Sequence, residues 1–201
     1  MPTIEYDTTR TRSRRDWLST LALIGALLFA GAVGWVTRPW ADEPDTTFGM
    51  SGAAEDAPRP GELAPDFRLK RADGSILHLA DLRGQPVFLN FWATWCTFCL
   101  EEMPDMQRIA EQFDGQLVVL GVNAGDSVAS GSGFAERIGA NYELVYDTEQ
   151  GVVAGYRVRS MPSSYFIDAD GRIVDAHLGF LTWDDMLAKV TALLEQGSAR
   201  P

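Results

Sequence analysis

Length, composition and charge already limit the function classes open to this chain. It has 201 residues, 46% of them hydrophobic, which is enough for one domain with a packed core plus a targeting or anchoring segment. From Ala41 onward, 12 lysines and arginines stand against 25 aspartates and glutamates. Such an acidic body repels phosphates, so the composition excludes DNA and RNA as expected partners.

The first predicted element is a transmembrane helix over residues 17–37, an apolar stretch without a charged residue. At about 1.5 Å per residue, this helix is long enough to cross the ~30 Å hydrocarbon core of a bilayer. Arginines cluster in residues 1–16 and acidic residues follow the span, so residues 1–16 are predicted to stay in the cytoplasm. Two alternatives remain open, cleavage near residues 30–32 and a twin-arginine export signal at 13–18, and both still place the domain outside the cytoplasm.

Residues 38–60 are rich in Asp, Glu, Pro, Gly, Ser and Ala, and few of them could join a core. This composition predicts a flexible linker. The linker would hold the folded domain, residues 61–201, away from the bilayer while keeping it near membrane partners.

Extended and helical patterns alternate after the linker. Extended segments at 66–70 and 76–79 flank the turn signal Ala72-Asp73-Gly74, which indicates a small β-hairpin. The apolar run Val87-Phe88-Leu89-Asn90-Phe91 predicts a buried strand, followed directly by two cysteines and a helix towards residue 113.

The rest of the chain continues this alternation and closes with a hairpin. Strands are expected at 117–122, 143–146, 164–167 and 172–178, and helices at 133–139, 148–156 and 182–195. Thr182 is the expected N-cap of the last helix, with Asp185 completing a capping box. This order predicts an α/β fold in which helices cover both faces of a mixed sheet.

Cys96 and Cys99 are the two cysteines of the chain, and they are interpreted as one chemical unit. A domain held together by structural disulfides carries more cysteines at wider spacing. If Cys96 lies at the first turn of the helix, the unpaired N–H groups and the dipole there stabilise its thiolate. Cys99 is then placed to attack a mixed disulfide formed at Cys96, so the pair is expected to cycle between dithiol and disulfide.

Glu102 is the candidate group for moving the proton of Cys99. At about 100° per residue, Glu102 lies ~60° from Cys99 around the predicted helix, whereas Glu101 lies ~200° away. The competing interpretation is a solvated carboxylate near the helix start, which is favourable for the helix on its own account.

No metal and no cofactor are expected at this site. A structural zinc ion needs four ligands, and beyond the cysteines the chain offers only His78 and His177, which form no ligand-like cluster. A cuprous site of two thiolates stays open as an alternative. Met161-Pro162 precedes a predicted strand, where the proline could be an ordinary strand-start residue or follow a cis bond.

Three stretches carry a family resemblance. They are Asn90-Phe91-Trp92-Ala93-Thr94-Trp95-Cys96-Thr97-Phe98-Cys99, Glu102-Met103-Pro104, and Met161-Pro162 followed by Tyr165-Phe166-Ile167-Asp168 and Gly171. They resemble the thioredoxin superfamily, and within it the TlpA/ResA-like branch of membrane-tethered bacterial disulfide reductases, over about residues 61–195. The resemblance implies a thioredoxin-like fold with a mixed central sheet flanked by helices, an N-terminal β-hairpin extension and a single N-terminal transmembrane helix.

The resemblance also implies roles for individual residues. Cys96 would be the exposed attacking thiol and Cys99 the buried resolving thiol of a redox-active disulfide. Glu102 would tune both thiols, which favours it over the solvated alternative. Pro162 would be a cis-proline opposite the disulfide.

Three further residues are expected to support the site. Trp95 directly precedes Cys96, and Met161 directly precedes Pro162. Asn90 occupies the position where cytoplasmic thioredoxins carry a buried aspartate, so proton handling would lie elsewhere.

The function that the resemblance implies is a protein disulfide reductase at the bacterial inner membrane, facing the periplasm or cell exterior. Its partners would be disulfides of exported proteins, including apocytochrome c, a membrane thiol-electron transporter as reductant, and the lipid bilayer through residues 17–37. Phe98 departs from the family pattern, since many relatives carry proline there, and this leaves the reduction potential and the direction open. A disulfide oxidase or isomerase and a copper-delivery module for oxidase assembly therefore remain alternatives.

Overall fold

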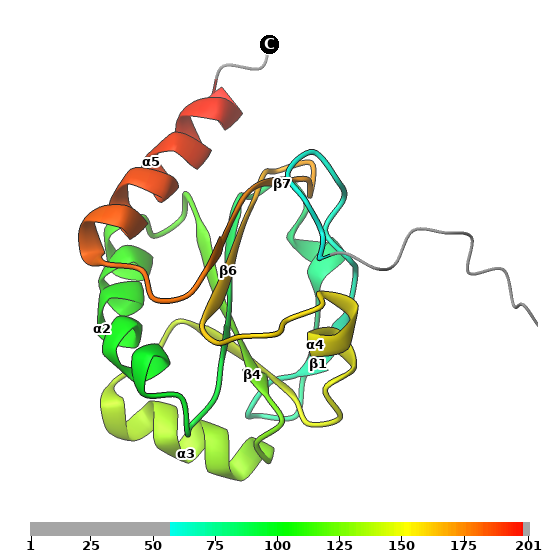
Figure 1. The fold of residues 1–201 in the computed structure, drawn as a ribbon, viewed down its shortest axis with the longest axis vertical. Helices are drawn as coiled ribbons and strands as arrows, with labels where there is room; N and C mark the ends of the chain where they lie inside the picture. The colour runs from blue at the N-terminus through cyan, green and yellow to red at the C-terminus, as the bar shows by residue number, and fades with distance from the viewer. Residues whose placement is uncertain (1–56, 199–201) are drawn as a thin grey trace, which may run out of the picture. The chain divides into compact units, whose positions relative to one another are not determined.

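A computed structural model describes residues 57–198, drawn in colour in Figure 1. The predicted cytoplasmic segment 1–16, the predicted span 17–37 and most of the predicted linker 38–60 lie outside the described residues, as do residues 199–201. Among the helices within 57–198, none is both long and apolar enough to cross a bilayer.

Between residues 57 and 198, seven strands form one mixed sheet in the order β2-β1-β5-β4-β3-β6-β7. The central strands β3, β4 and β5 run parallel, whereas β6 and β7 are antiparallel to their neighbours and β1 pairs antiparallel with both β2 and β5. The strands are β1 (Arg68–Lys70), β2 (Ile76–His78), β3 (Val87–Trp92), β4 (Val118–Ala124), β5 (Glu143–Asp147), β6 (Ser163–Ile167) and β7 (Ile173–Leu178).

Helices cover both faces of this sheet, as the element order predicts. The chain steps from β3 to β4 to β5 in one direction, so the right-handed crossovers α2 (Thr97–Gln112) and α3 (Val128–Ile138) lie on the same face. Figure 1 shows α2, α3 and α5 (Trp183–Ser198) on one side of the sheet and α4 (Gly151–Gly155) on the other. A short 3₁₀ helix, η1 (Leu79–Leu82), follows β2.

Strand β3 lies inside the sheet, between β4 and β6, and is buried along its whole length. Its side chains alternate between two apolar clusters. Phe88 and Trp92 pack with α2, while Leu89 and Phe91 pack with residues on the opposite face. Because both faces are covered, the strand is recognised in the sequence as a continuous apolar run rather than an alternating one.

Helix α3 begins five positions before its predicted start, at Val128. The side chain of Ser127 accepts the N–H of Ser130 at 3.2 Å and so caps the helix. Serine and glycine in the first turns have low helix propensity, which hid this start from the sequence pattern. Tertiary packing stabilises the helix there, because Gly131 has no side chain and lets α3 pack closely against Tyr146 of β5.

The cap of α5 agrees with the sequence prediction. The N–H of Asp185 donates to Thr182 Oγ1 at 3.2 Å, which makes Thr182 the capping residue. The hydroxyl of Thr182 in turn donates to the Asp185 carboxylate at 2.6 Å. The start of α5 is thereby fixed, and with it the loop that enters the helix from β7.

The two glycines of α3 offer a matched test of this packing. A Cβ at Gly131 would lie 2.7 Å from Tyr146 Cε1, whereas at Gly133 the nearest atom would be 3.8 Å away, at the end of Arg137. We therefore expect Gly131→Ala to lower the free energy of unfolding by about 1–3 kcal/mol through overpacking. Gly133→Ala should raise it by about 0.5–1 kcal/mol, because alanine loses less backbone entropy in a helix. Urea unfolding checks both values, and a loss of stability in the Gly133 variant would contradict this packing.

Candidate active site

The loop after β3 places Cys96 at the tip of α2. The N–H of Cys96 donates to the carbonyl of Ala93 at 3.1 Å, which closes a tight turn. Cys96 is the N-cap residue of α2, and its Sγ accepts the N–H of Cys99 at 3.2 Å. The sulfur thus contacts one of the unpaired donors of the first helical turn. This is the position predicted from the sequence, where the helix end stabilises a thiolate.

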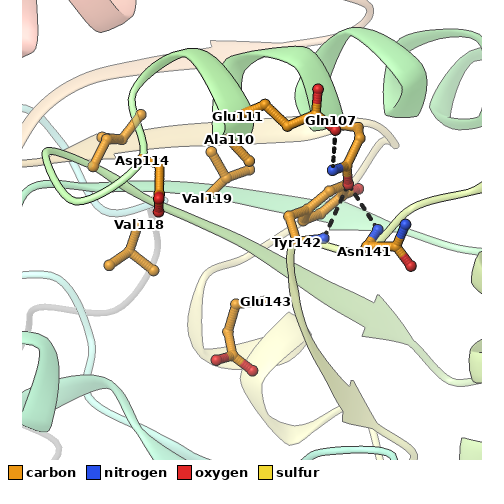
Figure 2. A pocket seen from close by; sticks show the side chains of 10 residues that line it. Gln107, Ala110, Glu111, Asp114, Val118, Val119, Asn141, Tyr142 and Glu143 are labelled. Carbon is orange, nitrogen blue, oxygen red and sulfur yellow. Dashed lines mark hydrogen bonds between the residues drawn. The ribbon is translucent and has the colours of Figure 1, made fainter.

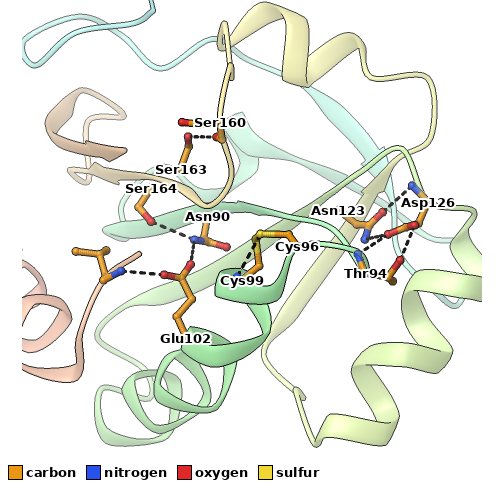
Figure 3. Close-up of a disulfide and its surroundings, with 11 residues drawn as sticks. Asn90, Thr94, Cys96, Cys99, Glu102, Asn123, Asp126, Ser160, Ser163 and Ser164 are labelled. Carbon is orange, nitrogen blue, oxygen red and sulfur yellow. Dashed lines mark hydrogen bonds between the residues drawn. A yellow bond between two sulfur atoms is a disulfide. The ribbon is translucent and has the colours of Figure 1, made fainter. Parts of the chain in front are cut away.

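Cys96 and Cys99 form a disulfide, with Cα atoms 5.3 Å apart (Figure 3). Cys99 is completely buried, as the resemblance implies. The expectation of an exposed Cys96 needs correction, because only 6% of this residue is accessible in the disulfide form. Cys96 is nevertheless more accessible than the fully buried Cys99, which is the order that the resemblance implies.

Glu102 is completely buried on the side of α2 that also carries Cys99, and its neighbour Glu101 is exposed. The interpretation of Glu102 as a solvated carboxylate is therefore wrong, and the angular argument from helix geometry is confirmed. Asn90 Nδ2 donates to Glu102 Oε1 at 2.7 Å, and the N–H of Leu181 donates to Glu102 Oε2 at 3.1 Å. Burial raises the pKa of Glu102 from 4.5 to about 7, against the opposing effect of these two hydrogen bonds.

Asn90 connects this carboxyl to the sheet. It lies opposite Ser164 in the register of β3 with β6, and its Nδ2 also contacts Ser164 Oγ at 3.1 Å. Asn90 is fully buried, and its Oδ1 has no hydrogen-bond partner within the described residues. An amide cannot take the proton of a thiol, so the titratable group at this site is the neighbouring Glu102.

A second polar cluster, made of Thr94, Asn123 and Asp126, holds the turn before Cys96. The Asp126 carboxylate accepts the N–H of Thr94 at 2.9 Å and its hydroxyl at 2.8 Å, and also accepts from Asn123 Nδ2 at 2.8 Å (Figure 3). Burial opposes ionisation of Asp126, but these hydrogen bonds outweigh it and lower its pKa. The sequence reasoning missed this cluster. The available signal was the pair of polar residues at the end of β4, a parallel neighbour of β3.

The Met161–Pro162 peptide bond is cis, as the resemblance implies. Pro162 directly precedes Ser163, which pairs with Phe91 near the end of β3, so it lies at the edge of the sheet where the chain turns towards Cys96. Met161 is partly buried against the cluster that contains both cysteines. Trp95 is 68% exposed beside Cys96.

Neither histidine lies in a metal-binding arrangement. His78 Nε2 is 2.5 Å from the Asp66 carboxylate, and His177 Nε2 is 3.2 Å from the carbonyl of Phe180. Within residues 57–198, no three His, Cys, Asp or Glu residues are grouped as a metal site would require. Both histidines therefore make local structural contacts.

An open hollow of about 480 Å³ lies at the other end of α2 (Figure 2). Its lining includes Gln107, Glu111, Asp114 and Asn141, and neither cysteine belongs to it. Gln107 Oε1 accepts the N–H groups of Asn141 and Tyr142, and its Nε2 donates to Glu111. Gln107 thus joins α2 to the segment before β5, and because neither cysteine lines the hollow, it is separate from the redox site.

A reactive disulfide at a helix tip on this mixed sheet defines the class: the protein is a thiol-disulfide oxidoreductase of the thioredoxin-like fold. Residues 60–176 match the AhpC/TSA family, and the chain belongs to that family. This confirms the resemblance seen in the sequence.

Named relatives agree with this assignment. The chain is 33% identical over 153 residues to the thiol-disulfide oxidoreductase ResA of Bacillus subtilis strain 168, covering 76% of this chain and 85% of the relative. It is 32% identical over 179 residues to the thioredoxin-like protein YneN of the same organism, covering 88% and 97%. A similar crystal structure is that of a putative thiol:disulfide interchange protein DsbE from Chlorobium tepidum. It has a TM-score of 0.65 and 28% identity, and the similarity covers 69% of this chain and 99% of that chain.

The buried carboxyl predicts a pH dependence of stability in the oxidised protein. Since the pKa of Glu102 is higher in the folded state, the folded protein binds more protons than the unfolded chain between pH 4.5 and 7. As the pH rises through this window, the free energy of unfolding should therefore fall by on the order of 3 kcal/mol. Above pH 7, Glu102 should cause no further change. Glu102→Gln should abolish this fall.

Glu101→Gln, a change at the exposed neighbour, serves as the matched control and should keep it. Denaturant unfolding at closely spaced pH values measures the slope. An unchanged slope in Glu102→Gln would show that another group is responsible.

Proposed function

We propose that this protein is a membrane-tethered, extracytoplasmic thiol-disulfide oxidoreductase that reduces disulfides in exported proteins, with apocytochrome c as a candidate substrate. A membrane thiol-electron transporter would return electrons to the pair. The observation that carries the proposal is the Glu102 carboxyl, which is buried on α2 one helical turn beyond Cys99 and has a pKa of about 7.

The proposed reaction consumes one substrate disulfide and the reduced pair. The Cys96 thiolate attacks one substrate sulfur, which forms a mixed disulfide and releases the other sulfur as a thiolate. Cys99 then gives its proton to Glu102 and attacks Cys96 Sγ. This step forms the Cys96–Cys99 disulfide, releases the second substrate thiolate, and leaves Glu102 with a proton to pass to it.

Glu102 supports the reducing direction on electrostatic grounds. Strong oxidants of this class are oxidants because their reduced, thiolate-bearing form is stabilised. A carboxyl that ionises near pH 7 in a buried position disfavours a second negative charge beside it. The reduced pair is then less stable relative to the disulfide, which lowers the reduction potential and favours donation of electrons.

The proposed location rests on the sequence of the leader. The apolar residues 17–37, the arginines before them and the acidic residues after them support a single span with the domain on the outer side of the bacterial inner membrane. Residues 38–60 would give the domain reach from that span. Tethering would keep it close to a membrane reductant and to chains emerging from export.

Protein substrates fit the surroundings of Cys96 better than small molecules do. Cys96 is the less deeply buried of the two cysteines, and two exposed aromatic side chains, Trp95 and Phe98, stand close to it in the chain. Apolar exposed surface next to a reactive atom favours contact with unfolded segments that still expose their own apolar residues. We propose that Trp95, Met161 and Pro162 help to seat such a segment.

The reduction potential of the pair tests the direction. We expect a value nearer to that of thioredoxin, about −270 mV, than to the strong oxidant DsbA, about −120 mV, by equilibration with glutathione. At pH 8, where Glu102 is ionised, Glu102→Gln should raise the potential by about 30 mV or more because the repelling charge is gone.

The control Glu101→Gln should leave the potential at its original value, because this side chain is exposed to solvent. A wild-type value near that of DsbA would refute the reductase and favour the oxidase. A potential that does not respond to Glu102→Gln would refute the electrostatic reason given for the direction.

A further inference from the structure

Two phenylalanines meet where α2 faces the loop between β7 and α5. Phe98 stands between the cysteines and is 58% exposed, and Phe180 belongs to the loop and is 38% exposed. Their ring centroids are 6.3 Å apart, with ring planes tilted by 50°. This spacing lies within the range of favourable aromatic pairs. Phe98 is also the residue that departs from the proline common in the resembled family.

The loop that carries Phe180 is fixed on its inner side. The N–H of Gly179 donates to the carbonyl of Pro162 at 2.9 Å, and His177 Nε2 lies 3.2 Å from the carbonyl of Phe180. The next residue, Leu181, is fully buried and donates its N–H to Glu102 Oε2 at 3.1 Å. Two consecutive residues therefore present an aromatic ring to α2 and a hydrogen bond to the buried carboxyl.

Helix geometry places Phe98 and Glu102 on the same side of α2. They are four positions apart, which makes them neighbours on one helix face. Side chains on a helix lean towards its N-terminus, so Glu102 leans towards the turn that carries Phe98. Phe98 and Phe180 thus belong to α2 and to the β7–α5 loop, the same two elements that carry Glu102 and its hydrogen-bond donor Leu181.

We propose that Phe98 and Phe180 form an aromatic cover that keeps water from the Glu102 carboxyl and holds the amide of Leu181 against it. Both phenylalanines are positioning residues, because they act on the thiols through Glu102. The inference rests on the proposed function in one respect, that Glu102 handles the proton of Cys99. Phe98, which stands where many relatives carry proline, thus has the role of shielding the Glu102 carboxyl from water.

The direction in which loss of the aromatic cover shifts the pKa of Glu102 can be predicted. Burial is the largest cause of the raised pKa of Glu102, and the hydrogen bond from Leu181 acts in the opposite direction. Loss of the cover hydrates the carboxyl and loosens that hydrogen bond, and because burial is the larger effect the pKa falls.

The other titratable groups around the carboxyl do not obscure this shift. In the oxidised protein Cys96 and Cys99 are joined in the disulfide and carry no charge. Burial raises the pKa of Tyr142, which also feels the charge of Glu102, so this phenol stays neutral. The imidazole of His177 contacts the backbone of the loop, with Nε2 3.2 Å from the carbonyl of Phe180.

The test is a titration of the Glu102 carboxyl carbon by NMR in the oxidised full chain in detergent, with Glu102→Gln assigning the signal. In the wild type we expect a midpoint at about 7. Phe98→Ala and Phe180→Ala should each lower it by about one pH unit, roughly a tenfold change in acidity. The double variant should shift no further than the larger single shift, because either change alone opens the pair.

Two controls keep the test specific. Phe98→Leu preserves an apolar side chain over the carboxyl and should retain most of the wild-type midpoint. Leu178→Ala removes a side chain that is 65% exposed near the same loop and should leave the midpoint unchanged. Thermal unfolding of each variant checks that the fold persists.

An unchanged or raised midpoint in both alanine variants would overturn the cover, and so would an equal shift in Leu178→Ala. The titration is made on the disulfide form and does not depend on whether the protein donates or accepts electrons. A failure of the reductase proposal would show in the potential instead, so the two failures are distinguishable.

Discussion

The whole site depends on two opposed electrostatic effects that act on one pair of sulfurs. At the tip of α2 the unpaired backbone N–H groups stabilise negative charge on Cys96. One turn beyond Cys99, the buried Glu102 would oppose a second charge near that sulfur and is proposed to accept its proton instead. In the proposed mechanism, the reduced pair therefore holds Cys96 ready as a nucleophile and keeps Cys99 protonated until the second step.

The sheet makes this arrangement rigid. Strand β3 carries Asn90 to the carboxyl and ends at the turn that leads to Cys96, and both of its neighbours brace that end. From β4, Asp126 holds the turn by accepting two hydrogen bonds from Thr94. From β6, Ser164 contacts the same amide that holds Glu102. A loop that carries a reactive atom gains its precision from such supports on fixed strands.

Features with a local cause were predictable from the sequence. The apolar run of β3, the helix after Cys96 and the capping residue Thr182 all depend on residues close together in the chain, and helix periodicity alone placed Glu102 on the side of Cys99. Partners supplied by distant segments left no such signal. The N–H of Leu181 is a backbone group that any residue could offer, and Asp126 reaches Thr94 only through the parallel register of β3 with β4. Burial of Glu102 likewise follows from tertiary packing, which is why its solvated alternative stayed open in the sequence.

The most direct measurement is the pH dependence of Cys96 alkylation in the reduced Cys99→Ser variant, where no second thiol contributes. A sulfur stabilised at the helix tip should react with a midpoint well below the value of about 8.5 for free cysteine. A midpoint at or above that value would contradict the arrangement, because Cys96 would then be an ordinary thiol near neutral pH.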